Sequence, residues 1–505
     1  MTDKTRQLAE ELYKLTKEIT VLNSCQAVLD WDERTYMPPK GSENRANQAA
    51  LIAGMVHEKF TSPRIGEIIE ELFQAGLDPE ADSIDSANLR EIKRAYDKAV
   101  KVPKSLVEEL SRTITMGQRA WQDAREKSDF PAFQPWMEKI VKLKRQQADA
   151  VGYKGVPYNA MLDDYEPGAS TAHITEVFAG LRDELVKLIG KINESGLKPD
   201  KSIITREYPI ERQEIFGTEA AKAIGFSFES GRLDKTVHPF CSGFGPGDIR
   251  ITTRYDKNHF PQAFFGILHE AGHGIYEQGL PAEHYGAPCG EAVSLGIHES
   301  QSRMWENMVG RSRSFWKHFL PKARKTFPEA LGGVTIDQFH FAVNDVRSSF
   351  IRVEADEATY NLHILLRFEM ESAFFNGDIK VSDVPALWNE KFQKYFGIKP
   401  DNDAKGCMQD VHWSAGLIGY FPTYTLGNLF AAQFFAKAKE DLGDLDSQFA
   451  AGDFGQLLGW LRKNIHSCGQ RYRADDLVKK ITGKPLSHQP LVEYLNVKYG
   501  ELYKL

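Results

Sequence analysis

The chain has 505 residues, 42% of them hydrophobic and 26% charged, which is ordinary for a globular protein with a large buried core. Its net charge of −7 lacks the basic excess of proteins that bind nucleic acid or a membrane surface, so we expect neither as a partner. The five cysteines form no CxxC pair, the N-terminal residues form no apolar leader, and no run of 18 apolar residues occurs. These features predict a cytoplasmic protein without disulfides.

Apolar residues at helical spacing dominate the chain. The N-terminal example is a series at spacings of three and four: Leu8, Leu12, Leu15, Ile19 and Leu22. The same periodicity predicts helices over 42–75, 85–127, 130–150, 171–195, 335–375, 384–395, 418–441 and 453–465. Because no repeat period and no low-complexity linker interrupts the pattern, we expect one mainly α-helical domain over residues 1–505, with two lobes as a possible subdivision.

One segment, residues 232–257, departs from the helical pattern. It alternates polar and apolar residues, is rich in β-branched residues, and has a Gly-rich turn from Ser242 to Gly247. This composition predicts a β-hairpin or a small sheet.

The segment 335–375 contains no Gly or Pro and is therefore predicted as one long helix. Thr335 is the expected N-cap, and Asn376-Gly377 the expected end. Four polar residues would then share one helical face: Arg352, Asp356, Tyr360 and His363.

A metal-binding pattern lies in Phe260–Gly279, where Pro261 suits the first turn of a helix. His269 and His273 are four residues apart, so both imidazoles can face one ion. Glu270 follows the first histidine and can take a proton from a water molecule at the ion. This HExxH pattern is typical of zinc peptidases.

Two histidines require a third protein ligand, which zinc peptidases often take from a glutamate. Glu291 and Glu299 are both candidates, and both are expected on a second helix beside the first. Spacing alone does not separate them.

Several further motifs give the chain a resemblance to the carboxypeptidase Taq family of thermostable metallocarboxypeptidases. They run in the family's order: Leu29–Pro39, His238-Pro239-Phe240, Asp248–Thr252, His269–His273, His298–Arg303, Ile351–Asp356 and Gly406–Trp413. The resemblance implies that Glu299 is the third ligand to zinc, for which cobalt can substitute. It also implies an elongated, mainly helical fold, like that of neurolysin and angiotensin-converting enzyme. Such a fold has a deep groove with a small β-sheet at its wall, and the family usually forms homodimers.

The activity implied by the resemblance is hydrolysis of the C-terminal peptide bond of peptides with broad specificity. Glu270 is the expected general base. His412, Tyr420 and Tyr424 are candidates for stabilising the oxyanion, although an aromatic stretch of this kind also suits core packing.

A carboxypeptidase must bind a free α-carboxylate, which the planar fork of arginine can do. Arg352 and Arg250 are the candidates, and the alternative for Arg352 is an i,i+4 pair with Asp356. His238 is a further candidate for substrate contact, with a capping or core role as the alternative.

Two other functions use the same residues. A metallo-oligopeptidase or dipeptidase would have the same metal helix and differ in where it cuts. A non-enzymatic helical scaffold could retain the metal helix as a remnant, although such a scaffold is expected to lose Glu270 or a ligand, and all are present.

Overall fold

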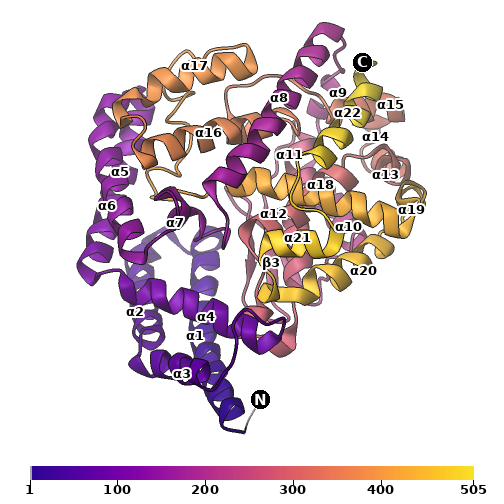
Figure 1. The fold of residues 1–505 in the computed structure, drawn as a ribbon. Helices are drawn as coiled ribbons and strands as arrows, with labels where there is room; N and C mark the ends of the chain where they lie inside the picture. Colours follow the sequence, from indigo (N-terminus) through magenta and orange to yellow (C-terminus); the bar gives the residue numbers. More distant parts are fainter. Residues whose placement is uncertain (1–2) are drawn as a thin grey trace. The chain divides into compact units, whose positions relative to one another are not determined.

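The computed structural model describes residues 3–505, and the chain is mainly helical, as predicted (Figure 1). It divides into two compact units, each built from segments distant in sequence. Unit 1 holds the residues up to Val100, Pro199–Val343 and Phe434–Gly483, and unit 2 holds Lys101–Lys198, Asn344–Gln433 and Lys484–Leu505. Within residues 3–505 no helix combines the length and the apolar character needed to span a bilayer.

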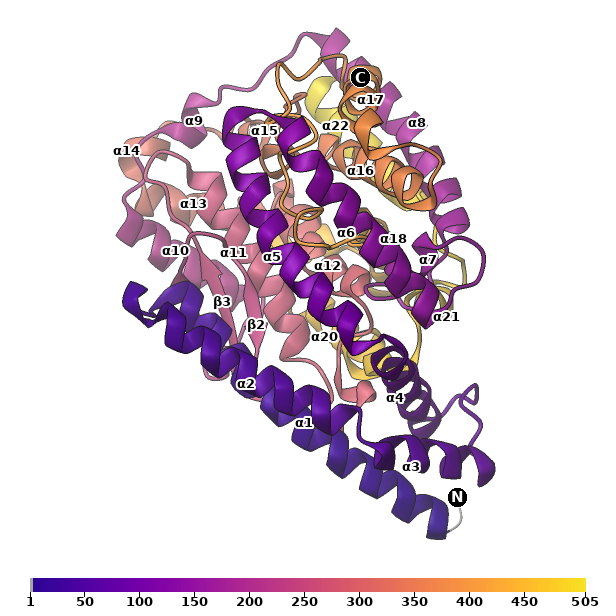
Figure 2. The same ribbon diagram turned by 90° about the vertical axis from the view of Figure 1, so that its left-hand side faces the viewer.

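Unit 1 begins with two helices that run side by side in opposite directions, α1 and α2 (Figure 2). A cluster of buried Leu and Ile side chains joins α1 to the two helices that follow α2. The helices of unit 1 are α1 (Asp3–Thr35), α2 (Ser42–Phe60), α3 (Pro63–Gln74), α4 (Ile84–Lys101), α9 (Ser202–Thr205), α10 (Ile210–Ala223), α11 (Phe260–Glu277), α12 (Leu295–Arg303), α13 (Arg313–Thr326), α14 (Pro328–Leu331), α15 (Ile336–Val343), α19 (Leu445–Ala451), α20 (Gly455–Asn464) and α21 (Ala474–Thr482).

The small sheet predicted over 232–257 is present in unit 1, with strand order β1-β3-β2. Its strands are β1 (Gly231–Lys235), β2 (Cys241–Gly243) and β3 (Ile249–Thr253). β2 and β3 form the antiparallel hairpin around the Gly-rich turn, and β1 pairs with β3 in parallel. The buried central strand β3 packs against α11, so the sheet supports the helix that carries the HExxH residues.

Helix α11 is anchored by aromatic side chains at its N-terminal end. Pro261 lies in its first turn, as predicted, where the missing N–H leaves no hydrogen bond unmade. The buried Phe264 ring stacks on Phe260 and Phe216 at 5.1 and 5.3 Å and lies 5.2 Å from Trp316. Close-packed aromatic contacts of this kind fix the helix in one position.

Unit 2 contains an antiparallel pair, α5 and α6, whose buried leucines pack together (Figure 2). Its α16 packs against both α8 and α17. The helices are α5 (Lys104–Lys127), α6 (Phe130–Val151), α7 (Tyr158–Leu162), α8 (Thr171–Ser195), α16 (Thr359–Asn376), α17 (Val384–Phe396) and α22 (Gln489–Tyr503). The residues of α18 (Pro422–Leu442) up to Gln433 belong to unit 2, and those from Phe434 belong to unit 1.

The predicted continuous helix over 335–375 is wrong. Its two ends are as expected, because Gln338 N–H donates to Thr335 Oγ1 (3.2 Å) and Gly377 adopts a φ of 92°. Between them, residues 344–358 are non-helical apart from a short 3-10 turn, Arg352–Glu354.

Distant partners bind the backbone of this break. Val346 N–H donates to the Tyr503 hydroxyl at 2.8 Å, and Arg352 N–H donates to Gln409 Oε1 at 2.8 Å. These tertiary bonds replace helical ones and override local propensity. The shorter breaks within 42–75 and 85–127 each precede or contain a proline, Pro63 and Pro103.

Candidate functional site

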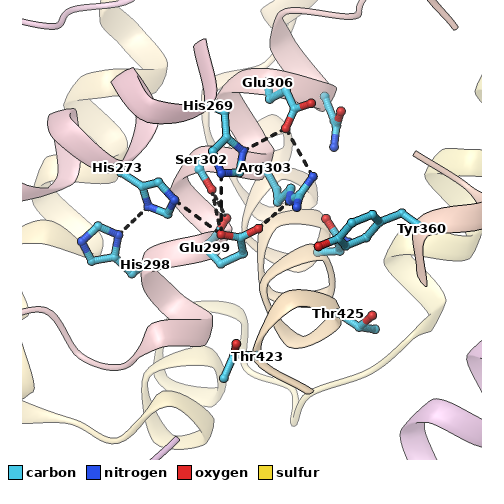
Figure 3. Close-up of polar contacts among 12 residues, drawn as sticks. His269, His273, His298, Glu299, Ser302, Arg303, Glu306, Tyr360, Thr423 and Thr425 are labelled. Carbon is cyan, nitrogen blue, oxygen red and sulfur yellow. Dashed lines mark hydrogen bonds and ion pairs between the residues drawn. The ribbon is translucent and has the colours of Figure 1, made fainter. Parts of the chain in front are cut away.

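His269 and His273 of α11 converge with Glu299 of α12, as predicted (Figure 3). Glu299 Oε2 lies 3.8 Å from His269 Nε2 and 3.4 Å from His273 Nε2, and the three donor atoms lie within 4.8 Å of one another. Ligands of a tetrahedral ion at its usual bond lengths are about 3.3 Å apart. Two imidazoles and a carboxylate at these separations therefore fit a divalent metal ion.

A glycine sets the separation of the two helices that carry these ligands. A Cβ atom on Gly272 would lie 2.6 Å from Ser302 Cα and 2.7 Å from the Gln301 carbonyl oxygen. Any other residue would force the backbones of α11 and α12 apart. Gly272 therefore brings Glu299 within reach of His269 and His273.

Each imidazole of the cluster also has a contact at Nδ1, the ring nitrogen that is not near Glu299. His269 Nδ1 lies 2.9 Å from Glu306 Oε2, and His273 Nδ1 lies 2.6 Å from His298 Nδ1 (Figure 3). Glu306 belongs to a π-helical turn, Met304–Val309, that continues α12. Such turns are rare and often occur at functional sites.

Arg303 and Arg311 keep the carboxylates of Glu299 and Glu306 charged. Arg303 donates to Glu299 Oε1 at 2.6 Å and lies 3.4 Å from Glu306 Oε2, and Arg311 lies 3.3 Å from Glu306 Oε1. Burial opposes ionisation, but Arg303 and the histidines outweigh it, so the pKa of Glu299 is lowered. Burial also opposes the ionisation of Glu306. The hydrogen bond with His269 and the charges of Arg303 and Arg311 outweigh burial and lower the pKa of Glu306 to about 2.

The two histidines titrate differently. Burial lowers the pKa of His273 to about 3, so this imidazole is neutral and able to bind a metal. For His269 burial acts in the same direction, but Glu299 and Glu306 outweigh it and raise the pKa.

Glu270 is buried, with 6% of its surface exposed. Burial is the largest cause that raises its pKa, to about 7, and the charges of Glu299 and Glu306 add to it. Its position beside the first histidine and its high proton affinity suit a general base or acid near neutral pH.

Glu291 does not join this cluster, and its predicted place on a second helix is wrong. It lies before α12, exposed, directly after the 3-10 turn Pro288–Gly290. Its chain segment contains prolines and glycines that prevent a helix. Glu291 instead lines a cavity of about 800 Å³ in unit 1, together with residues of α1 and α4.

Arg250 and His238 both lie in unit 1, Arg250 in an ion pair and His238 in an exposed loop. The Arg250 guanidinium binds Asp248 with two bonds of 2.9 and 2.8 Å and stacks over the Trp31 ring at 4.4 Å. These contacts account for the Asp and Arg of the Asp248–Thr252 motif. His238 is exposed in the loop between β1 and β2.

Arg352 belongs to a buried polar cluster in unit 2. Its Nε donates to Asp410 Oδ1 at 2.9 Å, its Nη1 donates to the Tyr360 hydroxyl at 3.0 Å, and its guanidinium lies 5.1 Å from the Tyr424 ring. Arg367 donates to the other oxygen of Asp410 at 2.6 Å. The two arginines outweigh burial and lower the pKa of Asp410.

The alternative pairing of Arg352 with Asp356 is therefore wrong. The prediction that Arg352 and Asp356 share one helical face with Tyr360 and His363 is also wrong. Because the chain breaks before α16, Asp356 lies outside the helix and accepts a bond from Thr359 N–H at 2.9 Å. It organises the start of α16.

The structure brings His412, Tyr420 and Tyr424 together in unit 2. His412 Nε2 lies 3.3 Å from the Tyr424 hydroxyl, and the Tyr420 ring lies 5.5 Å from the imidazole. The Nδ1 atom of His412 finds no partner among residues 3–505. Burial lowers the pKa of His412 to about 4, so the ring is neutral near pH 7.

The supporting residues were not predicted from the sequence. Glu306 is the partner of His269, and Glu277 and His298 lie behind His273. Glu277 could have been found, because it follows His273 by four residues on the same helix. No local signal predicts the pairing of Glu306 with His269 or of Asp410 with Arg352, because the members of each pair lie 37 and 58 positions apart.

The mainly helical fold and the two-histidine, one-glutamate cluster define a metallopeptidase of the helical type. The sequence matches the model of the carboxypeptidase Taq (M32) metallopeptidase family over residues 11–499. The chain belongs to this family, and it is a hydrolase of the metallocarboxypeptidase class that acts on peptides. The scaffold alternative is thereby set aside.

Several similar proteins match nearly the whole chain. Thermostable carboxypeptidase 1 of Thermus thermophilus is 46% identical over 505 residues, 98% of each chain. Carboxypeptidase 1 of Bacillus subtilis is 38% identical, over 98% of this chain and 99% of its own. The solved M32 carboxypeptidase of Deinococcus radiodurans R1 has a TM-score of 0.95 at 37% identity, over 99% of this chain and 100% of the other.

Proposed function

We propose that the protein is a zinc carboxypeptidase that removes single C-terminal residues with broad specificity, using Glu270 as the general base. The observation that carries this proposal is the convergence of His269, His273 and Glu299, with the buried Glu270 adjacent to the first of them. Two imidazoles and a carboxylate suit zinc, and cobalt can take the same ligands. A bound ion of this kind polarises a carbonyl oxygen and acidifies a water molecule.

Glu270 performs the proton transfers in this proposal. As a carboxylate it takes a proton from the attacking water while the oxygen of that water adds to the carbonyl carbon. The protonated Glu270 then gives the proton to the leaving nitrogen, and the C–N bond breaks. The raised pKa supports both steps, because a group that titrates near neutral pH accepts and releases a proton readily.

His412, Tyr420 and Tyr424 are proposed to donate to the developing oxyanion. The hydroxyl of Tyr424 and the ring of neutral His412 lie together, so either can supply an N–H or O–H donor. Removal of one such donor is expected to cost about 10²–10³-fold in kcat.

Arg352 is proposed to bind the terminal carboxylate of the peptide, with Arg250 and His238 as further substrate contacts. Arg352 and Arg367 share one carboxylate, Asp410, so the cluster has one positive charge in excess. An α-carboxylate would balance that charge and accept bonds from a guanidinium.

Broad specificity is proposed to come from main-chain recognition. β2 lies at an edge of the three-stranded sheet, because it pairs only with β3 in the described strands. An extended peptide can pair with a free strand edge through groups that every residue shares.

Product analysis on one peptide tests the cleavage mode. A ladder of successive single-residue losses from the C-terminus is expected; release of dipeptides or internal fragments would favour an oligopeptidase. Chelation should abolish activity, and zinc or cobalt should restore it. Recovery without added metal would contradict the metal's role.

Two further properties are proposed for the protein as a whole. All five cysteines are free, which supports a reducing, cytoplasmic location. A homodimer is proposed from the family resemblance, and light scattering coupled to size-exclusion chromatography measures it directly.

A further inference from the structure

The two imidazoles of the metal cluster are supported in different ways. His269 Nδ1 contacts a carboxylate directly, Glu306 Oε2 at 2.9 Å. His273 Nδ1 contacts a second imidazole, His298 Nδ1 at 2.6 Å, and His298 Nε2 in turn lies 2.7 Å from Glu277 Oε1. Figure 3 shows the His298 ring on the far side of His273 from Glu299.

The positions of the protons in this chain follow from the acceptor at its end. A carboxylate oxygen accepts, so His298 Nε2 carries the proton that points at Glu277 Oε1. With its ring proton on Nε2, His298 has a lone pair at Nδ1, and the 2.6 Å contact requires His273 to donate from its own Nδ1. A lone pair remains on His273 Nε2, the atom 3.4 Å from Glu299 Oε2.

The opposite direction of the hydrogen bond between His273 and His298 would prevent His273 from binding a metal through Nε2. If His298 donated from Nδ1, His273 would accept at Nδ1 and carry its proton on Nε2. That tautomer presents N–H, and not a lone pair, toward the metal position. An acceptor behind His298 keeps the ring proton on Nε2 and so disfavours this arrangement, and Glu277 is that acceptor.

We propose that His298 is a positioning residue that fixes the orientation and tautomer of His273, and that Glu277 acts on His273 through His298. The inference rests on the metal site of the proposed function and adds two residues to it. Both come from the same helix pair as the ligands, because Glu277 is one turn after His273 on α11 and His298 directly precedes Glu299 on α12.

The dissociation constant of Zn²⁺, measured by competition with a chelating dye, tests this role. His298→Phe removes the acceptor and should weaken zinc binding about 10–100-fold, the usual cost of losing a supporting contact. His298→Asn places an amide oxygen near the Nδ1 position and should recover most of the affinity. A dissociation constant within twofold of wild type for His298→Phe would overturn the proposal.

His298→Asn also distinguishes a role of His298 in positioning His273 from a role in packing alone. If His298 only filled space, His298→Asn would bind zinc no better than His298→Phe, and this result would reject the inference. The visible absorption of the Co²⁺-loaded protein gives a second readout, because a misoriented imidazole changes the ligand field. An unchanged cobalt spectrum in His298→Phe would also count against the role.

Glu277→Ala, made in the wild-type protein and in His298→Phe, tests whether Glu277 acts on His273 through His298. In the wild-type background it should weaken zinc binding, and in the His298→Phe background it should have no further effect. Equal losses in both backgrounds would show that Glu277 acts independently of His298.

The metal ligands themselves serve as the reference. Failure of His269→Ala and His273→Ala to weaken zinc binding would reject the metal site, and with it the proposed function. If these variants lose zinc while His298→Phe binds it normally, the metal site is supported and only the proposed roles of His298 and Glu277 are wrong.

Discussion

The polar clusters of the two units have opposite imbalances of charge. Unit 1 has three neighbouring carboxylates, Glu270, Glu299 and Glu306, and two guanidinium groups, Arg303 and Arg311, which contact Glu299 and Glu306. In unit 2 the guanidinium groups of Arg352 and Arg367 share the single carboxylate of Asp410. The first cluster lacks a cation, and the second lacks an anion.

The difference indicates what each cluster is built to bind. Uncompensated buried charge is costly, so it persists where a ligand of opposite charge completes the site. In the proposed function a divalent cation completes the first cluster, and the carboxylate of a peptide completes the second. The following changes alter one cluster at a time.

Glu270→Gln should have the largest effect on catalysis. It removes the proton acceptor but none of the three ligands, so kcat should fall about 10²–10⁴-fold while zinc content stays the same. Elemental analysis alongside kinetics measures both. Glu299→Gln is the matched control and should lose zinc as well as activity. An active Glu270→Gln enzyme would exclude Glu270 as the general base.

Arg352→Ala should weaken transition-state binding by about 2–5 kcal/mol for peptides with a free C-terminal carboxylate. The loss should be much smaller for the same peptides with an amidated C-terminus. Arg250→Ala is the comparison, because Arg250 is the second arginine proposed to contact the substrate, but it pairs with a carboxylate of its own, Asp248, and does not share one with another arginine. Equal losses on both substrates for Arg352→Ala, or a selective loss only for Arg250→Ala, would assign the carboxylate to another residue.

His412 should make unit 2 sensitive to acid. Burial holds its pKa at about 4, below the ordinary 6.5, so the unfolded chain binds a proton that the folded protein does not. The stability contribution is full above pH 6.5 and is lost as pH falls through 4. The free energy of unfolding of His412→Gln should therefore gain about 3 kcal/mol relative to wild type between pH 7 and pH 4.

Urea unfolding at a series of pH values measures this difference. A constant difference between the two proteins across the range would show that His412 is protonated equally in both states. The lowered pKa of His412 in the folded protein would then be excluded.

Gly272→Ala should have a smaller effect on stability, about 1–3 kcal/mol, through forced separation of α11 and α12. Zinc affinity should fall with it, because Glu299 moves away from the histidines. Gly266→Ala is the matched control on the same helix, since its Cβ would meet only Thr253 Oγ1 at 3.6 Å. It should be neutral or slightly stabilising. Equal zinc affinities for the two variants would contradict the spacing role of Gly272.

The parts predicted correctly from the sequence depend on neighbours in the chain. Helix α11 has its proline, its aromatic residues and its two histidines within one segment, and each signal acts locally. Glu299 could be chosen over Glu291 only by family resemblance, because both are ordinary glutamates at plausible spacing. The structure separates them through the turn that precedes α12.

The parts predicted wrongly depend on distant residues. Nothing within 344–358 shows that Tyr503 and Gln409 bind its backbone, so the local sequence predicts a continuous helix. The partner of Arg352 likewise lies 58 positions away, at Asp410. Gly272 gives no signal either, because its constraint comes from the backbone of another helix.

Anomalous diffraction at the zinc edge, from crystals grown with Zn²⁺, tests the central claim most directly. We predict a peak bound by His269 Nε2, His273 Nε2 and Glu299 Oε2, with bond lengths of about 2.0–2.2 Å. A zinc ion held by other residues, with these three side chains apart, would contradict it.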